Sequence, residues 1–219
     1  FLGGLIVYRH TNKYGERIPF KGHPALFQKH REVDFPKIAL YRKTYRVSLV
    51  LAAMVFSSVI SLFPKLISMS GISLENAGFL VVVGNIAVFL TFILMTRYRF
   101  WVGNPRLSFV LILLFPLSIP LFFLNTGVWT FLLVALFSGI NYSIPYTFAI
   151  FYGLNSPHED HGKQGGLHET MIGISFGLGP LLSGYFLEIW PGLYGIGILV
   201  VFLSAISVAN QFLFMKRVK

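Results

Sequence analysis

Cysteine is absent from the 219 residues of this sequence. The chain therefore has no disulfide framework and no thiol chemistry, although this absence does not define a cellular compartment. Charged residues are also scarce, at 12%, whereas soluble domains carry about 25%. Together with a hydrophobic content of 55%, this composition excludes an ordinary soluble core and indicates a polytopic membrane protein.

Acidic residues are the scarcer charge, with 8 Asp and Glu against 18 Lys and Arg, which gives a net charge of +10. A basic chain is compatible with nucleic-acid binding, but here the basic residues are separated by apolar segments and do not form one basic face. Positively charged loops between membrane spans account better for the pattern. We therefore expect a lipid bilayer as partner and no nucleic acid.

Motifs that carry chemistry are also missing. The sequence has no G-x-x-x-x-G-K-[ST] loop for ATP and no HExxH zinc motif. Histidines and carboxylates do gather at 158–161, with His168 and Glu169 close behind, and such groups can bind metals. The segment is rich in glycine, however, and a solvated loop explains it better. The expectation is no enzyme activity, no cofactor and no metal site.

Six apolar segments follow a polar N-terminal region, each close to the ~20 residues that a ~30 Å hydrocarbon core requires. The turns between them are short, so consecutive spans are antiparallel. Prolines inside the spans are expected to kink the helices rather than end them. The sequence thus predicts an all-α six-helix membrane bundle with spans at Val47–Met69, Asn76–Thr96, Leu107–Leu124, Val128–Tyr152, His168–Leu187 and Leu193–Met215.

The N-terminal region divides into two parts. Residues 1–8 are apolar but too few to span a membrane, so they are interpreted as the tail of a preceding helix. Residues 9–46 hold ten Lys and Arg and form a basic connector, of which 24–43 is compatible with a helix on the membrane surface. With the bundle at 47–219, this organisation predicts the C-terminal part of a longer protein.

The basic residues also predict an orientation. If the six spans alternate, 17 of the 18 Lys and Arg fall on one side, and Lys65 is the exception. The positive-inside rule then places the connector and the C-terminus in the cytoplasm. We expect an integral protein of the plasma (inner) membrane.

The segment 165–188 reads GGLHETMIGISFGLGPLLSGYFLE. Glu169, Gly173, Gly177, Pro180 and Gly184 recur at three- and four-residue spacing, which leaves one helix face nearly bare. Close approach through small residues brings membrane helices together, so this face is expected to meet a partner helix. This polar entry followed by GxxxGxGPLLSG resembles the eleventh helix of a major facilitator superfamily transporter.

The resemblance extends to the architecture, a basic central connector followed by six spans. It implies the second half of a secondary transporter that pairs with an N-terminal six-helix half and moves a small solute by alternating access. The family's signature between the second and third spans is poorly matched by MTRYRFWVGNPR, which lacks the acidic residue. The alternative is a non-transport membrane scaffold or a receptor-like bundle, and an upstream six-span half would distinguish the two.

A few polar side chains lie near the middle of the spans, where they are costly unless they face a helix or a cavity. For the serines we favour contact with an adjacent helix. Asn141 and Tyr142 share a face with Pro145, and they either contact another helix or line a cavity around which the helix bends. Amides and hydroxyls slightly favour a neutral or amphipathic solute, and the candidate pathway residues are Asn141, Tyr142, Asn85, Ser57 and Ser61.

Glu169 is the one carboxylate within a predicted span that is not at the outer end. In the first turn of a helix it would complement the free amides and the helix dipole, and this capping role is the favoured interpretation. The alternative is a proton-coupling or gating role, because a desolvated carboxyl can carry a proton.

Overall fold

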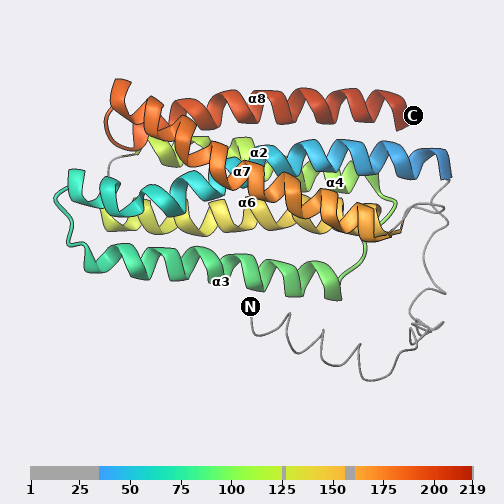
Figure 1. The fold of residues 1–219 in the computed structure, drawn as a ribbon, viewed down its shortest axis with the longest axis horizontal. Coiled ribbons are helices and arrows are strands. Elements are labelled where there is room, and N and C mark those ends of the chain that lie inside the picture. The colour runs from blue at the N-terminus through green and yellow to red at the C-terminus, as the bar shows by residue number, and fades with distance from the viewer. Residues whose placement is uncertain (1–34, 125–126, 156–160, 219) are drawn as a thin grey trace. The chain divides into compact units, whose positions relative to one another are not determined.

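The computed structural model describes residues 35–124, 127–155 and 161–218, all of which belong to one compact unit, Val33–Lys219. The predicted tail at 1–8 and the connector residues 9–34 lie outside the described residues. Every element in the described part is helical (Figure 1). The elements are α2 (Phe35–Met69), α3 (Glu75–Arg97), α4 (Pro105–Ile112), α5 (Leu114–Leu117), η2 (Ile119–Phe123), α6 (Val128–Leu154), α7 (His161–Ile189) and α8 (Leu193–Val218).

The predicted all-α bundle is confirmed. Among the described residues, 6 stretches of helix are long and apolar enough to cross a membrane, and they follow the predicted spans in order. Five of these stretches are single helices, and the sixth combines α4, α5 and η2 as Pro105–Phe123. The chain is therefore a polytopic membrane protein.

Helix α2 begins well before the predicted start at Val47, and its first turns continue directly into the span. The suggested surface helix at 24–43 is thus wrong for its described part, 35–43. The reason is packing. The ring of Tyr41 lies 4.8 Å from that of Tyr152 on α6 and 4.8 Å from that of Phe214 on α8, so these turns bury their apolar side against the bundle rather than against lipid.

Prolines have two different effects. Helices α2, α6 and α7 run without interruption through Pro64, Pro145 and Pro180, as predicted for membrane helices. The third span is instead broken into α4, α5 and the 3-10 helix η2, with Pro116 in α5 and Pro120 at the start of η2. Two prolines one turn apart remove two backbone donors from the same stretch, so a single α-helix cannot persist there.

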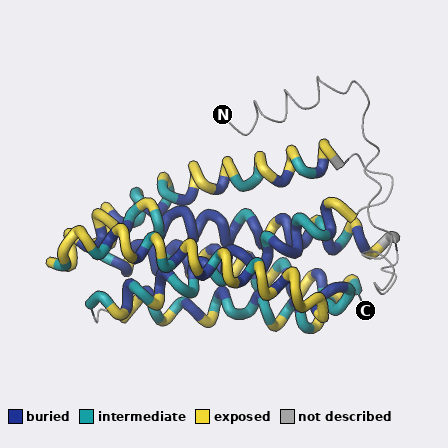
Figure 2. The backbone as a smooth tube through the Cα atoms, turned by 90° about the horizontal axis from the view of Figure 1, so that it is seen from below, coloured by how far each residue is buried: buried dark blue, intermediate teal, exposed yellow. Residues whose placement is uncertain are grey.

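The core is formed by α2 and α6. In their most apolar stretches 67% and 61% of residues are buried, against 28% in α3 and 22% in α7. Helix α2 packs against α6, α7 and α8, and α3 packs against α6. Figure 2 shows the buried positions gathered on the central helices, with exposed positions along the outer ones. Helices α3 and α7 therefore flank the central pair.

Small residues and polar side chains hold the helices together. At Gly139 of α6, an added Cβ would meet the carbonyl oxygen of Gly84 on α3 and would lie 3.0 Å from the Cβ of Ala87. Between α2 and α8, Gln211 Nε2 donates to Ser48 Oγ at 3.0 Å. Close backbone approach and interhelical hydrogen bonds of this kind are what associates helices in lipid.

One end of the bundle collects the basic residues. There the start of α2 meets the end of α6 and of α8 through Tyr41, and it meets the start of α7 through Arg46 and Gln164. We call this the basic end. The exposed basic side chains described there are Lys37, Lys43, Arg97, Arg99, Arg106, Lys163, Lys216 and Arg217.

Candidate functional site

Tyr142, one of the predicted pathway residues, lies near the middle of α6 within a cluster of aromatic rings. Its side chain is 7% exposed. Its ring stacks on Phe56 of α2, with centroids 4.9 Å apart and planes at 2°, and meets Phe176 of α7 at 5.9 Å in an edge-on contact. Tyr142 therefore joins α2, α6 and α7 at mid-depth.

One turn further along α6, Tyr146 forms a second set of ring contacts. It lies 4.9 Å from Phe92 of α3 and 4.7 Å from His168 of α7, and 5.6 Å from Tyr142. The rings thus form a continuous row from α3 across α6 to α7. We call this set the aromatic row, and its members are Phe56, Phe92, Tyr142, Tyr146, Phe176 and His168.

Glu169 stands beside this row. Helix α7 begins at His161 rather than at the predicted His168, so Glu169 lies two turns inside the helix. Only the first four amides of a helix are free, and the capping interpretation of Glu169 is therefore removed. Its side chain is exposed, and it directly follows His168, whose ring contacts that of Tyr146.

His168 is the most enclosed polar group of the row. The residue is buried, and neither ring nitrogen has a hydrogen-bond partner among the described residues. Sequence analysis treated His168 only as a helix end, because its buried neighbours come from other helices. A helical pattern continued through the polar residues before it would have placed it inside α7.

Asn141 contacts a different part of the bundle. It is buried, and its Nδ2 donates to Ser118 Oγ, at the end of α5, at 3.0 Å. Its Oδ1 is buried without a partner among the described residues. This hydrogen bond is the contact that the helix-packing alternative predicts, and a role of Asn141 in a solute pathway stays a prediction.

The remaining candidates lie outside the aromatic row. Asn85 of α3 is exposed and donates to the Val81 carbonyl of its own helix at 2.8 Å. Ser57 is buried and donates to Met54 O at 3.1 Å and to Ser175 O, on α7, at 3.3 Å. Ser61 is exposed on α2. Of the five predicted residues, only Tyr142 belongs to the aromatic row.

Sequence analysis missed a polar contact between α2 and α7 at the basic end. Arg46 Nη2 donates to Gln164 Oε1 at 2.6 Å and to the Gln164 carbonyl at 3.3 Å, and both residues are buried. A Cβ at Gly153 of α6 would lie 3.4 Å from the same Nη2. The sequence assigned Arg46 to the connector. Its position as the last basic residue before the apolar run was the feature that could have indicated a contact inside the bundle.

The glycine face of α7 is open in the described residues. A Cβ added at Gly173, Gly177 or Gly184 would meet nothing within 4 Å, whereas one at Gly179 would meet the Met54 carbonyl of α2. The predicted partner helix is therefore not supplied by the described part of this chain. Together with the exposed Glu169 and Phe176, these glycines leave an uncovered face of α7 that carries a charge and an aromatic ring.

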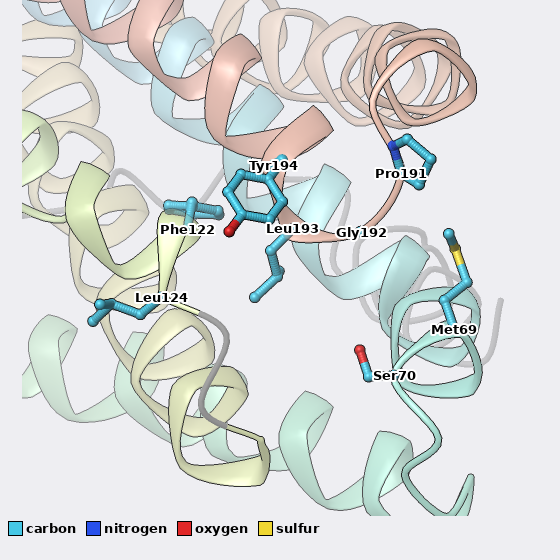
Figure 3. A pocket seen from close by; sticks show the side chains of 8 residues that line it. All are labelled: Met69, Ser70, Phe122, Leu124, Pro191, Gly192, Leu193 and Tyr194. Carbon is cyan, nitrogen blue, oxygen red and sulfur yellow. The ribbon is translucent and has the colours of Figure 1, made fainter.

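A cavity of about 360 Å³ lies at the end opposite the basic end (Figure 3). Its walls come from the end of α2, the end of η2 and the turn between α7 and α8. None of the predicted pathway residues lines it. The lining residues are Met69, Ser70, Phe122, Leu124, Pro191, Gly192, Leu193 and Tyr194.

The histidines and carboxylates at 158–161, which were interpreted as part of a solvated loop and not as a metal site, lie almost wholly outside the described residues. Comparison with known proteins gives no match to a family model and none to a curated protein. The fold and the residues define the class, which is a polytopic membrane protein with six apolar helices in its described part. A more specific function has to be argued from the uncovered face.

Proposed function

We propose that this chain is half of a secondary transporter, which moves a small solute by alternating access against an N-terminal six-helix half. The observation that carries the proposal is the uncovered face of α7. It presents Glu169 and exposed glycines at positions where a lipid-facing helix would carry large apolar side chains. Helix α7 also exposes Ile174, Leu178 and Leu181, much as α8 exposes Phe202, Ile206 and Leu213. The carboxylate and the exposed glycines are therefore what support a protein or aqueous neighbour for α7.

Glu169 is costly to expose to lipid. A carboxylate or an unpaired amide directed into the bilayer core costs several kcal/mol, so such groups face a protein or a water-filled cavity. A second half that covers the face in one state and uncovers it in another satisfies this requirement. Solute sites of this type lie near the midplane between the two halves, which is the depth of Tyr142.

The resemblance to the major facilitator superfamily supports the same proposal, and it assigns α7 the position of the eleventh helix. A non-transport scaffold or receptor-like bundle also needs a covered face, but it needs no alternation. Transport activity therefore separates the two. With the basic end on the cytoplasmic side, the solute would pass between that side and the opposite one.

The test is uptake into proteoliposomes by the full-length protein and, separately, by residues 1–219 alone. We expect saturable solute uptake by the full-length protein and none by residues 1–219, because one half supplies only one wall of the pathway. Both preparations must be monodisperse before reconstitution. Saturable uptake by residues 1–219 alone would contradict the proposal, and so would a full-length protein that moves no solute.

A further inference from the structure

The aromatic row presents exposed rings as well as buried ones. Phe176 is 41% exposed, and Tyr146 is partly exposed. Gly173 and Gly177 carry no side chain to shield them, and a Cβ at either position would meet nothing within 4 Å. The side chains of Phe176 and Tyr146 are thus at least partly accessible to a ligand.

A negative charge accompanies these rings. Glu169 is exposed and directly follows His168, whose ring lies 4.7 Å from that of Tyr146. The other two carboxylates of the described helices, Glu75 and Glu188, lie in terminal turns. In the described residues Glu169 is therefore the single fixed negative charge at this depth.

Aromatic faces attract cations through their quadrupole, and amines with several alkyl groups are bound in aromatic cages on this basis. A carboxylate beside the rings adds an ion pair, which is strong where water is excluded. A neutral solute would leave Glu169 without a counter-charge in the covered state. The combination favours an organic cation over an anion, and over the neutral solute expected from the sequence.

We propose that Glu169 and the exposed rings of Tyr146 and Phe176 form a binding site for an organic cation, a quaternary or protonated amine. This inference rests on the proposed transport function and specifies its substrate class. The ammonium group lies over the rings with its charge toward the Glu169 carboxylate. Tyr142, which stacks on Phe56, contacts the rings of both Tyr146 and Phe176.

Two neighbouring groups bear on the site. Arg46 is basic, but its guanidinium donates to Gln164, one turn of α7 nearer the basic end than His168. His168 is buried against Tyr146 and is not directed to the open side. Arg46 thus contacts α7 on the side of His168 toward the basic end, whereas Glu169 and Phe176 are both exposed on α7.

The test is equilibrium binding of radiolabelled choline to the purified full-length protein, with 3,3-dimethylbutan-1-ol as its uncharged competitor. We expect saturable choline binding that the neutral alcohol does not displace. Glu169→Gln and Tyr146→Leu should weaken it about tenfold. Tyr146→Phe, which keeps the ring, and Glu188→Gln, which removes a carboxylate at the far end of the same helix, should leave it unchanged.

If Tyr146→Leu does not fold, Phe176→Leu replaces it, because that side chain is already exposed. The inference is overturned if the folded wild-type protein binds no choline, if Glu169→Gln binds it as the wild type does, or if the alcohol competes equally. Failure of the proposed transport function can be distinguished from failure of this binding site. Uptake of a neutral solute that choline does not inhibit keeps the transporter and rejects this site, whereas choline binding without any uptake keeps the site and rejects transport.

Discussion

Asn141 shows how a single amide is accommodated in an apolar helix. Its Nδ2 bonds Ser118 on a neighbouring segment, whereas Asn85 turns back to its own helix. Interhelical hydrogen bonds of this kind contribute on average about 0.6 kcal/mol in membrane proteins. The two asparagines are therefore a matched pair for separating packing from transport.

We expect Asn141→Ala to lower the free energy of unfolding of the protein in detergent by about 0.5–1 kcal/mol, because the hydrogen bond to Ser118 is lost. Asn85→Ala should leave stability unchanged. A double-mutant cycle of Asn141→Ala with Ser118→Ala measures the coupling, which should be about 0.6 kcal/mol. Normal stability together with impaired uptake would instead assign Asn141 to the solute pathway.

The sequence alone indicates how deep these residues lie in the membrane. It does not indicate which neighbouring helix each side chain contacts. Tyr142 and Asn141 are neighbours in α6, yet the first joins rings of α2 and α7 and the second bonds the end of α5. Helical periodicity shows that they differ by about 100°. Which neighbour lies in each direction depends on the tertiary packing, which no local pattern contains.

At the scale of the helix, α7 has two glycine faces with different surroundings. Gly179 lies against α2, where an added Cβ would meet both the Met54 carbonyl and Ser57 Oγ, whereas Gly177 has nothing within 4 Å. The sequence pattern predicted close contact for the face of Gly177 and did not single out Gly179. The face that packs within the described bundle is therefore the one on nearly the opposite side of α7.

This difference predicts the effect of a single methyl group. Gly179→Ala should destabilise the bundle by about 1–3 kcal/mol, because the crossing of α7 on α2 has no room for it. Gly177→Ala should not lower stability in residues 1–219. Both variants would be compared by thermal unfolding in the same detergent. Equal stability of the two would show that α7 does not pack on α2 as described.

Helix boundaries were the least predictable feature. Hydropathy identified the stretches that cross the membrane, but α2 and α7 both begin before those stretches. Some polar residues before those stretches are buried by contacts between helices, such as Arg46 with Gln164. Because this burial comes from partners distant in sequence, the apolar window alone sets the start of each helix too late.

For the whole molecule, the segregation of charge predicts an orientation. Single cysteines at Arg99 and Gly192 lie at opposite ends of the bundle, and the 219 residues contain no other cysteine. In intact cells, an impermeant thiol reagent should label cysteine at 192 and spare cysteine at 99, because basic loops stay in the cytoplasm. Permeabilised cells serve as the control, where both should react. The reverse pattern would invert the topology.

The architecture followed from composition because six apolar stretches of membrane-spanning length leave few alternatives to a helical bundle. Two other features of the structure did not follow from composition. The break of the third span depends on Pro116 and Pro120 acting together, and the aromatic row depends on rings from α2, α3, α6 and α7 that converge only in the folded chain.

On the proposed function, the face of α7 that bears Glu169 and Phe176 borders an aqueous pathway rather than lipid. Phe176 on this face and Phe202 on α8 are a suitable pair, since both lie in the interior of their helices and are 41% and 59% exposed. Each would be replaced by cysteine in full-length protein without other cysteines. The rate of reaction with a charged methanethiosulfonate reagent is then measured in native membranes.

Thiols react with such reagents as thiolates, which form only in contact with water. The account predicts that Phe176→Cys reacts at least about tenfold faster than Phe202→Cys, whose thiol lies in hydrocarbon. Equally slow reaction at both positions, with normal labelling of a cysteine at Arg99 in permeabilised cells, would contradict an aqueous pathway along α7.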